Sequence, residues 1–299
     1  MTGTVPIDPV EVSGWDEAHA LELLDRWESA IPRRSLAEVP ERQGGQAVVL
    51  GDSHADWPTT RWLAERFLLG GESVAGFFAL GDFVDRTPAR LPQGSLRNAL
   101  FLLSLQAAHP DRVVLLRGNH ETQRQIPGTM RDVLSESTEL FGTPTVGDRI
   151  EDLFDRLPLA ALTASGVYMA HAGFPFPSEG EWREALRAAS VRTLEQVVWN
   201  DVEGSPTCGG RGILQEPIRE GHLKEFLARS GSRVLLRGHD PAVAGRFFYG
   251  GRLLTIHSTR VYASAGLTLA KIPLDATVPT LTGGHLVRLP FPELPTRTS

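Results

Sequence analysis

The sequence is poor in cysteine. Cys208 is the only cysteine among 299 residues, which excludes an internal disulfide and a zinc site built from thiolates. Proteins of reducing compartments rarely depend on disulfides, so this composition predicts a cytoplasmic location. Cys208 itself is interpreted as an ordinary loop residue in preference to an oxidisable thiol.

Segments typical of membranes or of secretion are also missing. No stretch approaches the ~18 consecutive apolar residues of a membrane-spanning helix. Residues 1–16 have neither the basic region nor the apolar region of a signal peptide. We therefore expect no membrane partner.

Positive charge is scarce, and lysine is nearly absent. Thirty basic residues stand against 36 acidic ones, the formal net charge is −6, and Lys224 and Lys271 are the only lysines. A protein whose main partner is nucleic acid usually carries a basic face, so we do not expect that partner. Because arginine supplies nearly all of the positive charge, one arginine by itself is a weak sign of a phosphate site.

The order of the apolar segments predicts an α/β fold. After residue 46, strands alternate with helices at about 59–69 and 96–108, which is the pattern of βαβ units with a mainly parallel sheet. From residue 247 onward, short apolar segments separated by glycines predict antiparallel strands that form or complete a second sheet. Further helices are predicted at 15–27 and 181–198, the first of them covering the sheet.

Polar residues follow five of the predicted strands directly. The segment 47–50 leads into Asp52 and His54, the segment 75–80 into Asp82, Asp85 and Arg86, and the segment 113–116 into Asn119, His120 and Glu121. Two later strands, at 167–170 and 233–236, lead into His171 and His239. Because α/β proteins bind ligands at the carboxyl ends of their strands, we expect these side chains to meet at one edge.

Six of these side chains are the candidate metal ligands, and all six offer oxygen or imidazole nitrogen and no sulfur, namely Asp52, His54, Asp82, Asn119, His171 and His239. This donor set suits divalent Mn, Fe, Zn or Co. Two neighbouring ions need a bridging group, and a carboxylate with two oxygens can serve. Asp82, central in the series, is the predicted bridge.

The motifs around these residues resemble a known family. They are Gly51-Asp52-x-His54, Gly81-Asp82-x-Val84-Asp85-Arg86, Gly118-Asn119-His120-Glu121, His171-x-Gly173 and Gly238-His239, in this order. Together they resemble the calcineurin-like metallophosphoesterases. The forms Asp-x-Val-Asp-Arg and Leu-Arg-Gly-Asn-His-Glu look specifically like the phosphoprotein phosphatase (PPP) group of serine/threonine phosphatases.

The resemblance implies a four-layer αββα fold, in which a β-sandwich of mixed parallel and antiparallel sheets is flanked by helices. The chain would then divide into an N-terminal helical extension at 1–45, a metallophosphoesterase domain at 46–285 and a C-terminal tail at 286–299. An insertion at 122–157 and a loop at 204–212 are the candidates for substrate specificity.

The resemblance also implies roles for individual residues. Asp52, His54 and Asp82 would hold one divalent ion, and Asp82, Asn119, His171 and His239 the other. His120 would be the general acid, with Asp85 as its orienting partner. Arg86 and Arg211 would bind the substrate phosphate, together with Asn119. Mn is the expected metal, with Fe, Zn or Co as alternatives, and Glu121 is expected to fix the site through hydrogen bonds.

The implied function is hydrolysis of phosphomonoesters, on serine/threonine or tyrosine side chains of phosphoproteins, by direct attack of a metal-bridging hydroxide. A second reading is hydrolysis of a dinucleoside polyphosphate or another nucleotide. A third is a metal-binding scaffold without turnover, against which the intact His120, Asp85 and Arg86 argue. The oligomeric state is left open.

The chain departs from the eukaryotic pattern in places that suggest a bacterial-type member. Ala55, Thr87 and Ala172 each replace a glycine of that pattern. The segment 257–262 stands where eukaryotic members have Ser-Ala-Pro-Asn-Tyr. It begins with His257, for which we expect a structural or hydrogen-bonding role in preference to metal ligation.

Overall fold

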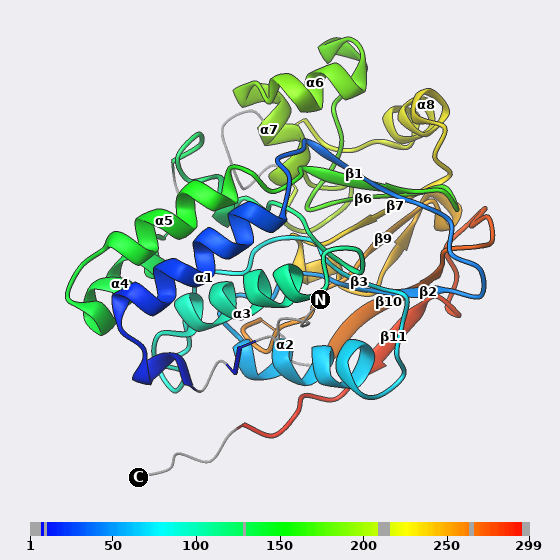
Figure 1. Ribbon diagram of the computed structural model, residues 1–299. Coiled ribbons are helices and arrows are strands. Elements are labelled where there is room, and N and C mark those ends of the chain that lie inside the picture. Colours follow the sequence, from blue (N-terminus) through cyan, green and yellow to red (C-terminus); the bar gives the residue numbers. More distant parts are fainter. Residues whose placement is uncertain (1–6, 9–10, 128–129, 209–215, 263–265, 295–299) are drawn as a thin grey trace.

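Two β-sheets pack face to face between two layers of helices (Figure 1). The computed structural model describes residues 7–8, 11–127, 130–208, 216–262 and 266–294. The predicted mixed four-layer arrangement is confirmed.

The five-stranded sheet has the order β11-β10-β2-β3-β4. Its strands are β2 (Gln46–Leu50), β3 (Gly76–Ala79), β4 (Val113–Leu115), β10 (Leu267–Pro273) and β11 (Leu286–Leu289). Strands β2, β3 and β4 are parallel, as predicted for the region after residue 46. Strand β10 runs antiparallel to both β2 and β11.

The six-stranded sheet has the order β1-β5-β6-β7-β9-β8. Its strands are β1 (Leu36–Val39), β5 (Ala160–Thr163), β6 (Val167–Ala170), β7 (Val234–Arg237), β8 (Phe247–Phe248) and β9 (Leu253–Thr255). Strands β6, β7 and β9 are parallel, and β8 and β9 form the predicted hairpin.

The pleat of the strands sends alternate side chains to the two faces of each sheet. From β2 and β3, Val49 and Phe78 point inward and join Leu236 in the apolar layer between the sheets. Their neighbours Val48 and Phe77 point outward and pack under the helices. The strands are therefore buried on both faces, and their carboxyl ends are held rigidly.

Helices cover both outer faces (Figure 1). On the side of the five-stranded sheet lie α1 (Glu17–Ala30), α2 (Trp57–Ala64) with a π-helical turn (Glu65–Leu69), α3 (Gly94–Ala108), α4 (Asp132–Phe141) and α5 (Thr145–Phe154). On the other side lie α6 (Trp182–Ala188), α7 (Val191–Val198) and α8 (Glu220–Ser230). Short 3₁₀ turns span Glu11–Gly14, His120–Thr122, Pro177–Glu179, Pro241–Val243 and Tyr249–Gly251.

The predicted helix at 181–198 is in fact two helices. Ala189 adopts a left-handed conformation with φ 46°, which ends α6. Ser190 then caps α7, because its Oγ accepts a hydrogen bond from the backbone N–H of Thr193 at 3.1 Å. Helix α1 lies on the side of the five-stranded sheet, shares its apolar cluster, and packs on α3 and α5.

Two strands lie outside the segment predicted as the domain. Strand β1 belongs to residues 1–45 and pairs with β5, and strand β11 follows residue 285 and pairs with β10. The division into 1–45, 46–285 and 286–299 stays a prediction, although both flanking segments contribute to the sheets.

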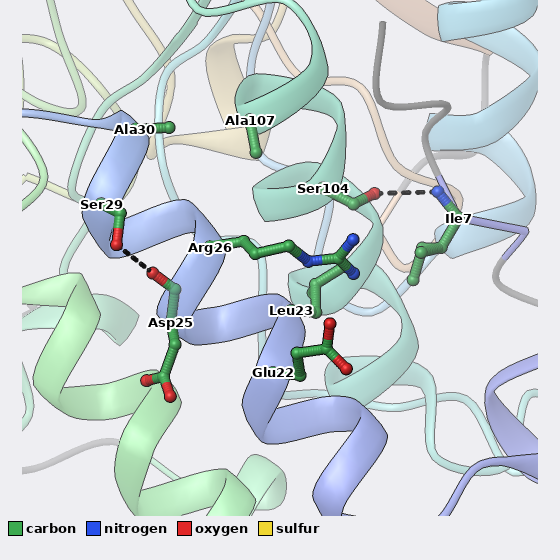
Figure 2. Close-up of a pocket in the computed structure, with 9 residues that line it drawn as sticks. All are labelled: Ile7, Glu22, Leu23, Asp25, Arg26, Ser29, Ala30, Ser104 and Ala107. Carbon is green, nitrogen blue, oxygen red and sulfur yellow. Dashed lines mark hydrogen bonds between the residues drawn. The ribbon is translucent and has the colours of Figure 1, made fainter. Parts of the chain in front are cut away.

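Figure 2 shows a side pocket between α1 and α3, lined by residues of these helices and by Ile7. Its volume is about 490 Å³. The backbone N–H of Ile7 donates to Ser104 Oγ at 3.2 Å and ties Ile7 to α3. None of the predicted site residues lines this pocket. Among the described helices, none has the length and apolar character that crossing a membrane demands.

Candidate metal centre

The carboxyl ends of six strands, β2, β3, β4, β6, β7 and β9, converge on one polar cluster. It consists of Asp52, His54, Asp82, Asn119, His120, His171, His239 and His257. Each of these residues is at most 4% exposed. Polar groups are buried at this density only where they bind each other or a ligand.

One half of the cluster brings four donor atoms together, one of which is Asp82 Oδ1. His171 Nε2 lies 3.4 Å from this oxygen, 2.9 Å from Asn119 Oδ1 and 3.2 Å from His239 Nδ1. His239 Nδ1 is in turn 3.1 Å from Asn119 Oδ1. These are the four residues that the resemblance assigns to the second ion.

The other half forms around the second oxygen of Asp82. His54 Nε2 lies 3.5 Å from Asp82 Oδ2 and 3.6 Å from Asp52 Oδ2. Asp82 therefore presents one oxygen to each half, an arrangement in which a carboxylate can bridge two ions.

The spacing of these atoms fits divalent ions. Bonds of ~2.1 Å place neighbouring ligands ~3.0 Å apart around an octahedral ion and ~3.4 Å apart around a tetrahedral one. The separations of 2.9–3.6 Å between the donor pairs given above lie within ~0.2 Å of that range in both halves. The donors are carboxylate, amide and imidazole groups, which suit Mn, Fe, Zn and Co.

Backbone contacts aim two imidazoles at the cluster. Nδ1 of His54 lies 3.1 Å from the carbonyl oxygen of Val84, and Nδ1 of His171 lies 3.0 Å from that of Leu80. Each Nδ1–H can donate a hydrogen bond to its carbonyl oxygen. The unprotonated Nε2 then directs its lone pair at the cluster. Burial lowers the pKa of His54 well below its usual range and that of His171 to about 4. Both rings are therefore neutral, the form that binds metal.

His120 pairs with the carboxylate of Asp85. Its Nδ1 lies 2.7 Å from Asp85 Oδ2, and its Nε2 lies 3.9 Å from Asp82 Oδ2. Burial alone would lower the pKa of His120, but the charge of Asp82 and the hydrogen bond to Asp85 outweigh it and raise this pKa to about 8. The ring can therefore hold a proton at neutral pH.

Glu121 joins the two loops that carry this chemistry. Its Oε2 accepts hydrogen bonds from the backbone N–H groups of Asp82 and Gly118 at 2.7 and 2.9 Å, and its Oε1 accepts from Phe83 at 2.7 Å. The loops after β3 and β4 are thereby locked together. The hydrogen-bonding role expected for Glu121 agrees with these contacts.

The predicted insertion at 122–157 also supports the site. At the start of α4, the backbone N–H of Asp132 donates to Asp85 Oδ1 at 2.8 Å. The Oδ2 atom of Asp132 accepts a hydrogen bond from the N–H of Thr87 at 3.2 Å. One turn later, Glu136 accepts hydrogen bonds from Thr87 Oγ1 at 2.5 Å and from the N–H of Leu96 at 2.8 Å. Helix α4 thus braces the loop that holds Asp85.

A cavity of about 260 Å³ opens over the cluster, and Arg86 and His120 are among its lining residues. The guanidinium of Arg86 lies 5.1 Å from the ring centre of Tyr262, and this ring centre lies 5.5 Å from that of His54 in a T-shaped arrangement. Sequence reasoning did not select Tyr262 or Trp199, which also line the cavity. Arg211 lies outside the described residues.

A sandwich of mixed sheets whose strand ends gather such donors has the metallophosphoesterase fold. A sequence model described as Calcineurin-like phosphoesterase matches residues 46–243. The chain belongs to this family, whose members use divalent metal ions, and the resemblance drawn from the motifs is confirmed at that level.

Two yeast proteins are similar in sequence. The chain is 28% identical over 210 residues to the serine/threonine-protein phosphatase 4 catalytic subunit of Kluyveromyces lactis, a match over 64% of this chain and 63% of that protein. It is also 28% identical over 238 residues to the protein of that name from Saccharomyces cerevisiae, over 76% of this chain and 73% of the relative. These relatives give no support to a bacterial-type subgroup.

Solved structures share the fold. A protein serine/threonine phosphatase from Saccharomyces cerevisiae superposes with a TM-score of 0.71 at 21% identity, over 98% of this chain and 92% of that chain. A cold-active protein-tyrosine phosphatase from a Shewanella species gives a TM-score of 0.56 at 16% identity, over 83% and 80%. At these identities the likeness concerns the fold alone.

Proposed function

We propose that the protein is a metal-dependent phosphatase that hydrolyses phosphomonoesters, with phosphorylated serine/threonine or tyrosine side chains of proteins as its main substrates. The observation that carries the proposal is Asp82, which offers one oxygen to each of two donor sets 3.4–3.5 Å away. Two divalent ions bound there would supply an activated water and neutralise charge on the phosphoryl oxygens.

The proposed ligands of the first ion are Asp52, His54 and Asp82. Those of the second are Asp82, Asn119, His171 and His239, with Asn119 also close to the substrate. Mn is the proposed metal, and the same donors accept Fe, Zn or Co.

His120 is proposed as the general acid. Nδ1 faces Asp85 at 2.7 Å, so Nε2 is the atom that can give a proton to the departing alkoxide oxygen. Asp85 keeps the ring oriented and charged. No covalent bond between enzyme and phosphate is required.

Arg86 is proposed to bind two phosphoryl oxygens through its planar fork. It lines the cavity over the cluster and lies above the ring of Tyr262. Arg211 is proposed as the second arginine on resemblance alone.

Phosphoproteins are favoured over nucleotides because the two yeast relatives are named as protein phosphatases. Dinucleoside polyphosphates are the alternative substrates. A scaffold without turnover is disfavoured by the intact pair of His120 and Asp85. The cytoplasmic location, with no nucleic acid or membrane as partner, stays a prediction that rests on composition.

The test uses metal-stripped protein supplied with Mn, Zn, Fe, Co or Mg. Hydrolysis of p-nitrophenyl phosphate, phosphoserine and phosphotyrosine peptides and diadenosine tetraphosphate is compared for the wild type and for His120→Asn. We expect metal-restored turnover of the peptides that falls by ~10²-fold or more in the variant.

The matched control is His222→Asn on α8, which should keep wild-type turnover. Faster hydrolysis of the dinucleotide would replace the proposed substrate class. No turnover of any ester with any metal would leave only the scaffold reading.

A further inference from the structure

His257 follows β9 and lies against the first donor set. Its Nε2 is 3.4 Å from Asp52 Oδ2. The donor atoms of Asp52, His54 and His257 all lie within 4.8 Å of one another. The sequence motifs that suggest the metal centre do not include this residue.

The imidazole of His257 is buried with one nitrogen unsatisfied. The residue is 3% exposed, and Nε2 has no hydrogen-bond partner among the described residues. A buried imidazole nitrogen left in this state is unfavourable unless a ligand completes it. Because Nε2 faces a carboxylate that already belongs to the cluster, a cation between them would satisfy both.

The backbone fixes His257 beside Asp52. The two residues form a parallel bridge, and the N–H of Ser258 donates to the carbonyl oxygen of Asp52 at 3.1 Å. Ser258 Oγ accepts from the N–H of Gly51 at 3.0 Å. The chains are so close here that a Cβ on Gly51 would lie 2.3 Å from the carbonyl oxygen of Ile256.

Contacts on the other side complete this position. The N–H of His257 donates to Thr268 Oγ1 at 2.8 Å, and the N–H of Thr268 donates back to the carbonyl oxygen of His257 at 2.9 Å. Further along, Arg260 Nε lies 3.0 Å from the buried carboxylate of Asp56. These backbone hydrogen bonds hold the His257 ring in a fixed position beside the cluster, as a metal ligand requires.

We propose that Nε2 of His257 is a ligand of the first ion, together with Asp52, His54 and Asp82. Three of the separations, His257–Asp52 at 3.4 Å, His54–Asp82 at 3.5 Å and His54–Asp52 at 3.6 Å, lie within ~0.2 Å of the ~3.4 Å edge of a tetrahedral site with ~2.1 Å bonds. The inference rests on the metal centre of the proposed function and gives both ions four protein donors.

The direct test is nuclear magnetic resonance of the full chain labelled with ¹⁵N at histidine. Metal-stripped protein is titrated with Zn²⁺ and the two nitrogens of each ring are followed. We expect Nε2 of His257 to move to a metal-bound position along with Nε2 of His54 and His171. If those two move and His257 does not, the inference is wrong while the metal centre stands. If none moves, the metal centre and the inference fail together.

Variants give a second readout, the affinity for Zn²⁺ measured by calorimetry. His257→Phe keeps the ring packing but removes the donor, and His257→Gln keeps a polar side chain. Loss of a residue that only orients a ligand typically costs 10–100-fold in affinity. We expect the ion held by Asp52, His54 and Asp82 to bind more than ~100-fold more weakly to both variants.

The matched control is Ser258→Ala, which removes the hydroxyl that holds the backbone beside Gly51 but no donor. It should retain two bound ions with less than a ~10-fold change in affinity. If Ser258→Ala lost as much affinity as His257→Phe, the effect would come from the position of the backbone beside Gly51. The proposed ligand role of His257 would then be wrong. Because the resonance experiment uses the wild type, it decides the matter even if a variant does not fold.

Discussion

Nδ1 of His120 lies 2.7 Å from Oδ2 of Asp85, and both side chains are buried. The pair is assembled from two loops and a helix, because Asp85 also accepts a hydrogen bond from the start of α4 at 2.8 Å. A carboxylate held in this way favours the protonated imidazole. The hydrogen bond to Asp85 therefore favours the protonated His120 that the proposed reaction needs as its general acid.

Replacing Asp85 by Asn should lower the pKa of His120. The amide oxygen can still accept the Nδ1–H bond, but the negative charge that helps to raise this pKa to about 8 is lost. We expect the pKa of His120 in the metal-free protein to fall by ~1 unit or more, as followed by the ring proton resonances. Phosphopeptide turnover at pH 7 should fall ~10-fold or more. An unchanged pKa would show that Asp85 does not set the charge of His120.

Glu136 should make the stability of the protein depend on pH. Burial raises the pKa of this carboxyl to about 7, against the hydrogen bonds from Thr87 and Leu96. Its pKa in the unfolded chain is about 4.5, so between these values the unfolded state binds fewer protons than the folded state. This contribution to the free energy of unfolding is therefore complete below about pH 4.5 and is lost as the pH rises to about 7, by up to ~3 kcal/mol.

The Glu136→Gln variant should remove that slope. We expect it to be ~1–3 kcal/mol more stable than the wild type at pH 8 and close to it at pH 5, as measured by urea unfolding of metal-free protein. Glu139→Gln, at an exposed position of the same helix, is the control and should follow the wild-type curve. Parallel curves for the wild type and Glu136→Gln would refute the assignment.

Much of the five-stranded sheet and its loops could be predicted because the signal is local. Each buried strand is a short apolar run, and each donor follows its strand within a few positions. Strand β1 lies in the segment predicted as a helical extension, and the sequence does not reveal it because its four residues, Leu36–Val39, include Glu38 and depend on pairing with β5. Such a strand is stabilised by its partner and not by its own pattern.

His257 shows the same limit at the site. Its neighbour Asp52 lies more than 200 positions away in the chain, and the bridge between them exists only after β9 reaches the end of β2 through the packing of the sheets. Tyr262 likewise meets Arg86 only in the folded chain. A single sequence contains no spacing rule that would bring these residues together.

Gly118 should be indispensable, since a Cβ there would lie 2.3 Å from Asp82 Oδ1 and 2.8 Å from Glu121 Oε2. Gly118→Ala should push the carboxylate of Asp82 away from the neighbouring donor atoms. We expect at least ~10-fold weaker binding of Mn²⁺ by calorimetry and a loss of ~2 kcal/mol or more in unfolding free energy. Gly221→Ala, in α8 with open space around it, should be neutral or slightly stabilising. Normal metal binding by Gly118→Ala would mean that the loop can shift without cost.

Tyr262 should affect substrate binding more than the chemical step. Its ring centre lies 5.1 Å from the guanidinium of Arg86 and 5.5 Å from the ring centre of His54, so it holds the arginine over the cavity. A cation–π contact at a partly exposed site contributes ~0.5–1 kcal/mol, which corresponds to a ~2–5-fold change in binding. Tyr262→Ala should therefore raise KM for a phosphopeptide ~2–5-fold with a smaller change in kcat, whereas Tyr262→Phe should stay near the wild type because it keeps the ring. A fall in kcat with KM unchanged, or an equal defect in Tyr262→Phe, would point to the phenol hydroxyl in the chemical step and away from the positioning of Arg86.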